Sequence, residues 1–234
     1  MESKFGEFLV SKYWGKACLH RNLAQNTRVA VIVETRDAFF LPLVIANTVD
    51  KLGADWNLHV IAPAEVLASL RKSLPECEFA STTLACPTKI STSQYSALLR
   101  RRSFWSRIRE EIILVFQLDV VMLRGVPAWA ESYDYIGAPC GVLDDKYVIN
   151  GGLSLRKKSA MLQLSGDDSM SESEAEDIFF TRELRSAGAA LPSIRDATRF
   201  ACESIYEKEC CGVHGTCHYF LPSDTVAQML SESI

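Results

Sequence analysis

Gln117 and Asp119 interrupt the most apolar stretch of this 234-residue chain, which runs from Ile112 to Leu123. A carboxylate is costly to remove from water, so one set among the residues of a buried strand usually has a partner. Because the two residues are two positions apart, an extended backbone points both side chains to the same side. Two oxygen-bearing side chains at a strand end could hold a hard divalent cation with a diphosphate on its far side. The alternative is a polar pair that caps a turn.

A second polar group follows an earlier predicted strand. Residues 29–34 read Val-Ala-Val-Ile-Val-Glu, a run typical of a strand buried on both faces, and Thr35 and Arg36 come next. In an open α/β sheet, ligands bind beyond the carboxyl ends of the strands. If this strand and the one over 112–116 are parallel, Glu34, Thr35 and Arg36 fall in the same region as the polar pair. Arg36 could then contact a phosphate or a base, or form a salt bridge to the next residue, an aspartate, or to a helix end.

Alternating strands and helices would position these groups. Residues 41–52 carry apolar side chains three and four apart, which predicts a helix, and Gly53 stands where a C-terminal glycine belongs. A strand is predicted over 56–62, followed by a helix from Pro63 to about Leu74. This β-α-β-α order implies right-handed crossovers and a layered α/β sheet.

The middle of the chain is predicted to add one helix and three strands, over residues 91–105, 112–116, 133–138 and 148–155. Within the last of these, Asn150-Gly151-Gly152 marks a place where the backbone is exposed, closely approached or bulged. The acidic, serine-rich residues 166–174 predict a solvated loop. After this loop, Ser173 and Glu176 fit a capping box for a helix that ends at Gly188. Three parts are expected: an N-terminal extension that the sequence does not place, a single domain, and a tail or short helix, over residues 1–27, 28–222 and 223–234.

Composition excludes several classes of protein. Hydrophobic residues make up 48% of the chain and charged residues 23%, as in soluble globular proteins. The net charge of −4 argues against nucleic-acid binding, although Arg100-Arg101-Arg102 forms a basic segment that is best interpreted as a solvated helix end. No apolar stretch approaches the roughly 18 residues that span a bilayer. The first residues lack the apolar core of a signal peptide, which predicts a cytoplasmic protein. The sequence contains no Gly-x-Gly-x-x-Gly motif, so a dehydrogenase of the Rossmann type has no support. It contains no Gly-x-Ser-x-Gly motif either, so an α/β-hydrolase has none.

Seven sequence blocks occur in a characteristic order, at residues 31–36, 95–99, 115–119, 133–139, 150–156, 176–180 and 212–214. Together they resemble a largely uncharacterised family of glycosyltransferase-like domains related to the GT-A nucleotide-sugar transferases. The resemblance covers about residues 28–219. It implies a single α/β domain of GT-A layout, with a mixed, mostly parallel sheet between helices. It also implies transfer of a sugar from a nucleotide-diphosphate donor to a hydroxyl of a glycan or another acceptor.

The resemblance implies a cation site. GT-A enzymes hold a divalent cation with an Asp-x-Asp motif, and Gln117-Leu118-Asp119 is similar to it, with an amide in place of the first carboxylate. Asp119 would be the anionic ligand, and His214 resembles a further ligand that these folds often supply late in the chain. Mn²⁺, which tolerates mixed oxygen and imidazole ligation better than Mg²⁺ does, is the expected cation. It would offset the diphosphate charge as the leaving group departs.

The resemblance also implies nucleotide and donor-sugar contacts for seven residues: Glu34, Thr35, Arg36, Gln117, Asn150, Gly151 and Gly152. The small residues among them would allow close approach of a sugar ring. Glu176-Asp177 resembles the acidic pair beside the acceptor in inverting enzymes, which need one carboxylate as the base. Since Glu176 already serves the predicted capping box, Asp177 is the expected base. Its alternative role is to complement the helix dipole.

Two competing hypotheses remain open. Cysteine and histidine residues gather near the end of the chain, and tetrahedral Zn²⁺ prefers such ligands: Cys202, Cys210, Cys211, His214, Cys217 and His218. Free thiols or a disulfide would also explain them. The second hypothesis is a non-catalytic module that binds a nucleotide sugar or a glycan, because Gln117 replaces an acid.

Overall fold

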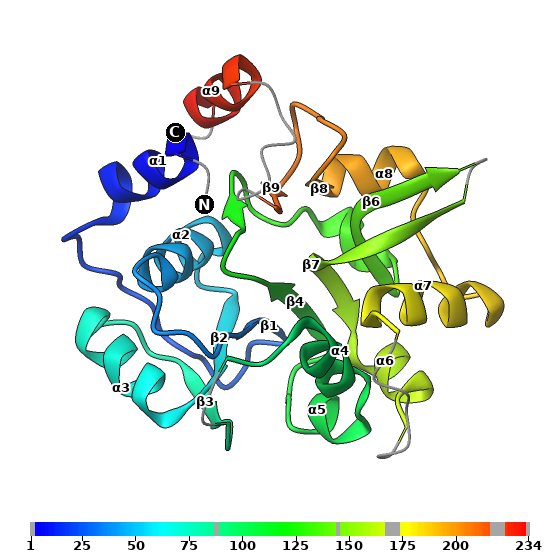
Figure 1. Cartoon of the computed structure of the whole chain (residues 1–234), viewed down its shortest axis with the longest axis horizontal. Helices are drawn as coiled ribbons and strands as arrows, with labels where there is room; N and C mark the ends of the chain where they lie inside the picture. Colours follow the sequence, from blue (N-terminus) through cyan, green and yellow to red (C-terminus); the bar gives the residue numbers. More distant parts are fainter. Residues whose placement is uncertain (1–2, 87–88, 144–145, 167–173, 216–222, 233–234) are drawn as a thin grey trace.

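A computed structural model describes residues 3–86, 89–143, 146–166, 174–215 and 223–232. Figure 1 shows a central sheet with helices around it. The strands are β1 (Arg28–Val33), β2 (Trp56–Ala62), β3 (Ala80–Thr83), β4 (Ile112–Phe116), β5 (Val121–Met122), β6 (Tyr135–Leu143), β7 (Lys146–Lys157), β8 (Ala201–Cys202) and β9 (Gly212–Val213). The α-helices are α1 (Ser3–Tyr13), α2 (Leu41–Leu52), α3 (Ala64–Ser73), α4 (Thr92–Arg100), α5 (Arg102–Ser106), α6 (Lys158–Leu164), α7 (Glu176–Ser186), α8 (Ile194–Phe200) and α9 (Ser223–Glu232).

The main sheet has six strands in the order β3-β2-β1-β4-β7-β6. β1 pairs in parallel with β2 and β4, and β2 with β3, whereas β7 is antiparallel to both β4 and β6. The chain thus adds β2 and β3 on one side of β1 and then crosses to the other side with β4. This reversal is the point at which an open α/β sheet binds ligands. The predicted mixed, mostly parallel α/β sheet is confirmed.

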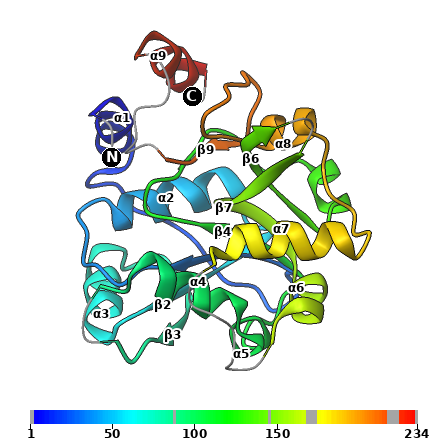
Figure 2. The same ribbon diagram turned by 45° about the vertical axis from the view of Figure 1, so that its right-hand side comes forward.

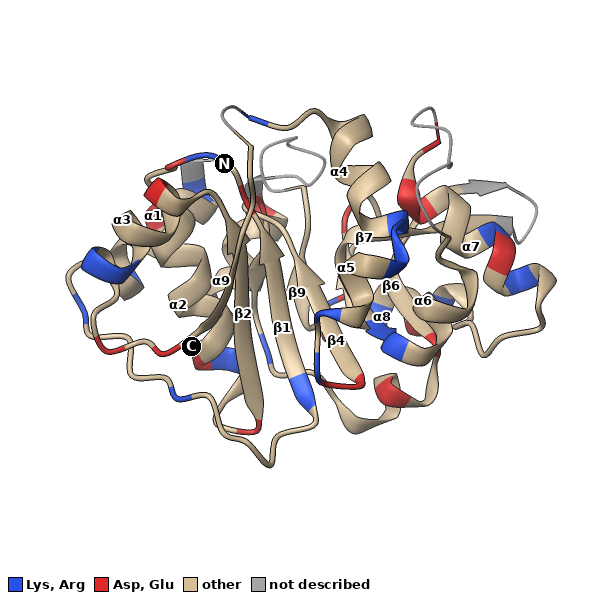
Figure 3. Cartoon of the chain, turned by 90° about the horizontal axis from the view of Figure 1, so that it is seen from below, with Lys and Arg blue, Asp and Glu red and all other residues tan. Residues whose placement is uncertain are grey.

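Successive residues of β1 face two different apolar cores, as the period of two in a strand requires. Ala30 and Ile32 belong to one core, together with apolar side chains of α1, α2, α3 and α9. Val29, Val31 and Val33 belong to the other, which includes side chains of α4, α5, α6 and α7. Figure 2 and Figure 3 show these helices on the two sides of the sheet. Burial on both faces explains why the strand reads as a continuous apolar run.

The structure confirms the predicted elements over 29–34, 41–52, 56–62 and 112–116 within one or two residues. The predicted helix over 91–105 is two helices instead. Arg101 has an extended backbone, and the next amide donates to the Gly166 carbonyl at 3.0 Å, so a bridge to another segment replaces the helical bond. The sequence also missed the exposed edge strand β3, whose residues Ala-Ser-Thr-Thr lack a strong apolar pattern.

Both terminal segments contain helices that pack on the domain. The sequence did not place the first 27 residues, yet α1 buries Phe5 and Leu9 in the same core as α2. The predicted C-terminal helix is present as α9, and it contacts α1 (Figure 1). The division of the chain at residues 27 and 222 stays a prediction. Of the helices in the described residues, none has the length and hydrophobicity needed to cross a bilayer.

A smaller sheet in the order β5-β9-β8 lies beyond the end of β4. Val121 of β5 pairs with Val213 of β9 in antiparallel register, and Cys202 of β8 pairs with Val213 in parallel register. Asp119 precedes β5, Glu203 follows β8 and His214 follows β9. This small sheet therefore brings three ionisable residues from distant parts of the sequence to one place.

Candidate active site

A cleft of about 350 Å³ lies beyond the carboxyl ends of β1 and β4. Glu34, Thr35 and Arg36 line it from β1, and Gln117 and Asp119 line it from β4. The parallel pairing of the two strands, the condition on which the sequence prediction depended, places both groups at the same edge of the sheet. Both residues also lie in a turn, in which the Val120 amide donates to the Gln117 carbonyl at 3.2 Å, so the alternative of a polar pair that caps a turn stays a prediction.

Glu34 organises the backbone on the β1 side of the cleft. One of its carboxylate oxygens accepts hydrogen bonds from the amides of Thr35 and Arg36, both at 2.8 Å. The Arg36 guanidinium grips the same carboxylate with two bonds, at 2.8 and 2.7 Å. The expected salt bridge of Arg36 thus forms with Glu34 rather than with Asp37. Glu34 is buried while the Arg36 side chain is 47% exposed, so the guanidinium can still reach a bound anion.

His214 lies between the polar pair on one side and Glu203 on the other. Its Nε2 atom is 3.2 Å from the Gln117 amide oxygen and 3.5 Å from an Asp119 carboxylate oxygen. Its Nδ1 atom is 3.4 Å from a Glu203 carboxylate oxygen. The predicted partners Asp119 and His214 are therefore neighbours. A carboxylate behind a histidine is the arrangement that fixes the tautomer and ring orientation of metal-binding imidazoles.

The charges around His214 control its protonation. Burial lowers the pKa of the imidazole, but the contact with the Glu203 carboxylate and the charges of Asp119, Glu203 and Asp177 outweigh it. The net result is a pKa above the ordinary value. In the absence of a cation, a proton on His214 thus balances part of the negative charge in this cluster.

The Asn150-Gly151-Gly152 segment is a bulge in β7. The pairing with β6 loses register between Gly137 and Pro139, opposite this segment, which confirms the bulge expected from the glycines. The Asn150 side chain stabilises it, because its oxygen accepts from the Gly152 amide at 2.8 Å and its nitrogen donates to Glu203 at 3.2 Å.

Both glycines of the bulge make room for the protein's own side chains. A Cβ atom on Gly151 would lie 2.0 Å from a Glu176 carboxylate oxygen, and one on Gly152 would lie 2.0 Å from Nε2 of His214. The sequence explained these small residues by the approach of a sugar ring. The close neighbours in the structure are instead Glu176 and His214, so a donor-sugar contact at this segment stays a prediction.

A buried ion pair joins β7 to the start of α7. Arg156 is fully buried, and its guanidinium donates to both carboxylate oxygens of Glu176 at 2.7 and 3.0 Å. It also donates to the Gly151 carbonyl at 3.2 Å and lies over the ring of Tyr135, 4.7 Å from its centroid. A charge this deep requires a hydrogen-bonded partner, and Glu176 provides it.

The predicted capping box of Ser173 and Glu176 is wrong. Ser173 lies outside the described residues, but α7 begins at Glu176 with Ala175 at the N-cap, so Glu176 does not occupy the third helical position. The physical reason is long-range: a buried guanidinium attracts this carboxylate more strongly than a local amide does. Glu176, the other member of the acidic pair in which the catalytic base was predicted, is thereby held by Arg156.

Asp177 follows this ion pair and faces the bulge. Its carboxylate accepts hydrogen bonds from the backbone amides of Gly151 and Ile178, the latter at 2.8 Å. Burial and the charge of Glu176 raise the pKa of Asp177 above its ordinary value, although the two amides and Arg156 oppose the shift. A carboxylate with a raised pKa, close enough to His214 to affect the pKa of that imidazole as well, has the property that a general base needs.

Three residues that sequence reasoning missed complete the site. Glu203 and Arg156 stand behind His214 and Asp177, and the Tyr95 hydroxyl is buried in the cleft wall beside the Gln117 amide. Tyr95 lies inside one of the sequence blocks, so a signal for it existed. Arg156 ends another of these blocks, whereas nothing in the local sequence distinguishes Glu203 from a surface charge.

The zinc hypothesis has no support in the described residues, among which no three His, Cys, Asp or Glu side chains converge to hold a metal by themselves. Cys217 and His218 lie outside the described residues. His214 faces Gln117, Asp119 and Glu203, and Cys202 and Cys210 contact one another instead.

Two arginines of the basic segment Arg100-Arg101-Arg102 make contacts within the domain. Arg100 is buried against the ring of Phe179, and Arg102 donates to the Leu162 carbonyl at 2.8 Å. Figure 3 shows basic and acidic positions interspersed along the elements.

Comparisons with known structures define the class of fold. The chain is similar to the apo-form glycosyltransferase GlyE of Streptococcus pneumoniae TIGR4, with a TM-score of 0.52 and 9% identity over 89% of this chain. The chain spans 60% of the length of that protein. At this identity the likeness shows the fold alone, which is GT-A-like. The chain belongs to the DUF5672 family of proteins of unknown function, whose profile matches residues 80–214.

Two further structures score slightly lower. A mannosyltransferase from Pyrobaculum calidifontis, solved in complex with GDP-Man and Mn²⁺, gives a TM-score of 0.49 and 13% identity over 82% of this chain and 64% of its own. Mouse xyloside xylosyltransferase 1 gives a TM-score of 0.49 and 12% identity over 81% of this chain and 98% of its own. Comparison of the sequence with curated proteins gives no match.

Proposed function

We propose that this protein is a metal-dependent glycosyltransferase that moves a sugar from a nucleotide-diphosphate donor to an acceptor hydroxyl. The observation that carries the proposal is the convergence of Gln117, Asp119 and His214 at the edge of a cleft at the switch point of a GT-A-like sheet. These residues come from separate parts of the chain. The distant structural similarity to nucleotide-sugar glycosyltransferases is consistent with this function.

The donor atoms around His214 fit a divalent cation. Adjacent ligands of an octahedral cation at about 2.1 Å lie about 3 Å from one another. The separations of 3.2 and 3.5 Å from Nε2 to Gln117 and Asp119 are close to this spacing. Asp119, His214 and the Gln117 carbonyl would supply part of the shell, and diphosphate oxygens and water the rest. Mn²⁺ suits this mixed set better than Mg²⁺. A bound cation would neutralise charge that develops on the leaving diphosphate.

The side of the cleft formed by β1 would bind the nucleotide. Glu34 holds the backbone of Thr35 and Arg36 in a fixed turn, and Arg36 presents its exposed guanidinium to the cleft. A guanidinium can pair with a phosphate or stack on a base. On the opposite side, Asn150 and Gly151 would face the donor sugar.

Asp177 would act as the base that removes the proton from the acceptor hydroxyl. Arg156 and Glu176 fix the start of α7, and the Gly151 amide fixes the Asp177 carboxylate, so the base is held relative to the bulge. A single base that acts during in-line attack inverts the configuration at the anomeric carbon. An inverting transferase is therefore proposed, with a glycan or another hydroxyl compound as the acceptor.

One observation favours a second candidate function, a binding module that does not catalyse transfer. Gln117 stands where the common motif has a carboxylate, and its amide oxygen contacts His214. A site with fewer negatively charged ligands binds a divalent cation with lower affinity. Such a module would bind a nucleotide sugar without turnover.

Incubation with UDP-, GDP- and dTDP-sugars distinguishes the two functions. The transferase proposal predicts that one donor, in the presence of Mn²⁺, raises the melting temperature and is slowly hydrolysed or transferred. Tight donor binding with no turnover, when a panel of glycan acceptors is supplied, would favour the binding module. The absence of any donor binding would overturn both.

A further inference from the structure

The Asn150 side chain uses both of its polar atoms inside the protein. Its amide oxygen accepts a hydrogen bond from the Gly152 amide at 2.8 Å, and its amide nitrogen donates one to Glu203 at 3.2 Å. An asparagine amide accepts only through its oxygen and donates only through its nitrogen, so these two partners fix which way it points. Asn150 therefore has a role within the site besides the predicted contact with a donor sugar.

The peptide unit between Gly151 and Gly152 is held at both ends. Its carbonyl oxygen, on Gly151, accepts from the Ser154 hydroxyl at 3.0 Å and from the Arg156 guanidinium at 3.2 Å. Ser154 is itself fully buried and accepts from Nε of Arg156 at 2.9 Å. The other end of the unit, the Gly152 amide, donates to Asn150. Asn150 thus completes the fixation of the bulge, which the buried guanidinium anchors from the opposite end.

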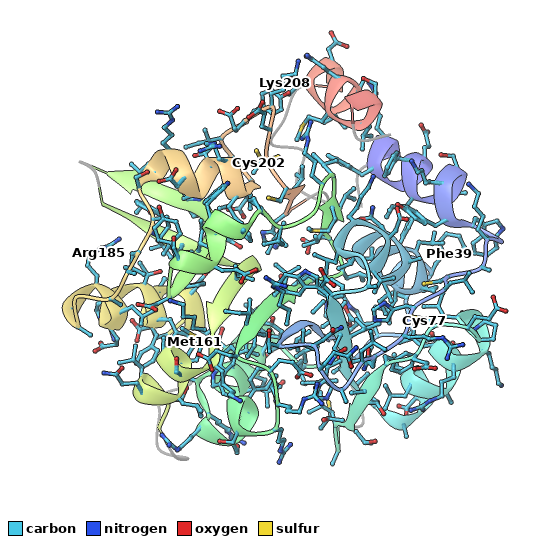
Figure 4. The ribbon with its side chains drawn as sticks, turned by 180° about the vertical axis from the view of Figure 1, so that it is seen from behind. Phe39, Cys77, Met161, Arg185, Cys202 and Lys208 are labelled. Atoms are coloured by element: carbon cyan, nitrogen blue, oxygen red, sulfur yellow. The ribbon has the colours of Figure 1, made fainter. Side chains whose placement is uncertain are left out.

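The Glu203 carboxylate serves Asn150 and His214 with the same oxygen atom. Its Oε1 atom lies 3.2 Å from Nδ2 of Asn150 and 3.4 Å from Nδ1 of His214. Cys202, the residue before Glu203, is labelled in Figure 4 and lies where β8 contacts β6. The Glu203 side chain is only 12% exposed, but nothing in the short strand β8 fixes its rotamer. The hydrogen bond from Asn150 selects the rotamer that faces His214.

The imidazole of His214 therefore lies between two groups that Asn150 holds. Glu203 is on the Nδ1 side, and the Gly152 backbone is so close on the Nε2 side that a Cβ atom there would lie 2.0 Å from Nε2. A purely structural role for Asn150 in the bulge would need only its bond to Gly152. The second bond, to Glu203, adds nothing to the bulge itself but orients the carboxylate behind the imidazole.

We propose that Asn150 is a positioning residue that sets the orientation of His214 for cation binding. Its hydrogen bond holds the Glu203 carboxylate against Nδ1, so that Nδ1 carries the proton and Nε2 turns its lone pair to the cation. A carboxylate behind a metal-bound histidine acts in this way, and Asn150 acts one step further out, on the carboxylate. This role rests on the proposed function, because it concerns the same cation site.

Asn150→Asp breaks one of the two bonds and keeps the other. The carboxylate still accepts from the Gly152 amide, but it has no donor for Glu203 and repels it. Affinity for Mn²⁺, measured by calorimetry at about pH 8, well above the ordinary histidine pKa of about 6.5, should fall about 10–100-fold. The added negative charge by itself would attract a cation, so a loss of affinity identifies the broken bond.

Asn26→Asp is the matched control. Asn26 precedes β1, at the end of this strand opposite the cleft, and its nitrogen donates to the Ala54 carbonyl at 2.8 Å. The same negative charge is added there without any contact to Glu203 or His214. Affinity of this variant for Mn²⁺ should equal that of wild type.

Adding Glu203→Gln to Asn150→Asp restores the contact with its polarity reversed. The new amide nitrogen at position 203 donates to the carboxylate at position 150, and the new amide oxygen remains for Nδ1 of His214. The double variant also has the same total charge as wild type. It should therefore recover most of the affinity for Mn²⁺ that Asn150→Asp loses, as expected for two residues that act through one contact.

Pulsed electron paramagnetic resonance of bound Mn²⁺ provides a readout that a role in the bulge alone would not change. Nitrogen modulation from the His214 imidazole should be present in wild type. At equal occupancy by Mn²⁺, it should weaken in Asn150→Asp and return in the double variant.

Three results would overturn this role of Asn150. The single variant could bind Mn²⁺ as wild type does, or the double variant could bind no better than the single one. Both variants could also fail to fold, as judged by circular dichroism, which would show that Asn150 serves the bulge alone. Failure of the proposed function has a different signature, because wild type itself would then bind no Mn²⁺, and the role of Asn150 would fall with it.

Discussion

The two sides of the candidate site are built in different ways. The strand-end side, formed by Glu34, Thr35 and Arg36 with Gln117 and Asp119, is set by the ends of two parallel strands. The bulge side, formed by residues 150–152, Asp177 and His214, depends on contacts between segments far apart in sequence. Its supports are a fully buried guanidinium and carboxylates from α7 and from the end of β8.

The two sides differ in what positions their side chains: local sequence pattern on one, and contacts between distant charged residues on the other. On the strand-end side, a continuous apolar run followed by polar residues is enough to place the side chains at the sheet edge. On the bulge side, the groups are placed by contacts between segments far apart in sequence, such as the Arg156–Glu176 ion pair and the contact of His214 with Glu203. The bulge side should therefore be the more sensitive of the two to single substitutions.

The largest effect is expected for Asp177→Asn. An amide keeps the backbone hydrogen bonds but cannot take a proton, so the rate of transfer should fall about 10²–10⁴-fold with donor affinity unchanged. Initial rates and donor binding, measured by calorimetry, would separate the two effects. Glu183→Gln on the same helix, exposed and paired with Arg182, is the matched control and should be as active as wild type. Wild-type transfer in Asp177→Asn would remove this residue from the mechanism.

Among these substitutions, breaking the buried ion pair should lower the free energy of unfolding most. Glu176→Gln leaves the guanidinium of Arg156 buried without a countercharge, and the free energy of unfolding should fall by about 3–5 kcal/mol. Urea unfolding followed by circular dichroism measures this change. Arg21→Gln, which breaks the exposed pair with Glu78, is the control and should change the free energy by under about 1 kcal/mol. Equal losses in the two variants would show that burial does not distinguish these pairs.

Gly152→Ala tests whether the bulge positions His214. A Cβ atom there would lie 2.0 Å from Nε2, so the imidazole must move away from Asp119. Affinity for Mn²⁺, measured by calorimetry, should fall about 10–100-fold, as for other disturbances of a ligand's support. Unchanged affinity, with the fold intact by circular dichroism, would mean that His214 is not a ligand.

The smallest expected effect is a pH dependence of cation binding. A cation displaces the proton from Nε2, and the pKa of His214 is raised, so affinity for Mn²⁺ should fall as the pH drops through this raised value. Below it, the loss approaches tenfold for each pH unit. In metal-free protein the sign is opposite: the stability gained from protonated His214 is complete below its unfolded pKa of about 6.5 and is lost as the pH rises through the folded value.

Glu203→Gln sharpens this prediction. Removing the carboxylate lowers the pKa of His214, so the midpoint of the pH dependence should move to lower pH. Calorimetric titrations with Mn²⁺ between pH 5.5 and 8, a range of about one unit or more on either side of the ordinary histidine pKa, measure the shift. Identical profiles for wild type and Glu203→Gln would show that Glu203 does not control His214.

Much of the fold was predictable because it follows from local pattern. The apolar run of β1 and the helical spacing of α2 each identify their element without any knowledge of the rest of the chain. The break at Arg101 was not predictable, since a bridge to Gly166 causes it. The helix α1 was missed because its apolar residues identify a buried helix face only once the core on the α2 side of the sheet, which they join, is known.

The candidate site divides in the same way. The convergence of Asp119 with the end of β1 needed only a parallel pair of strands. The role of Glu176 was misjudged because a nearby serine offered a plausible local partner, whereas Arg156, twenty positions away, is the actual one. Glu203 was missed because only the pairing of β8 with β9 brings it to His214.

The central claim is that Asp119 and His214 hold a cation that receives a nucleotide diphosphate. Calorimetric titration of UDP, GDP and dTDP into wild type and Asp119→Asn, each with and without Mn²⁺, tests it most directly. The account predicts that one nucleotide binds wild type tightly only when Mn²⁺ is present, and that Asp119→Asn loses this dependence together with most of the affinity. Nucleotide binding of equal strength in both proteins, indifferent to Mn²⁺, would contradict it.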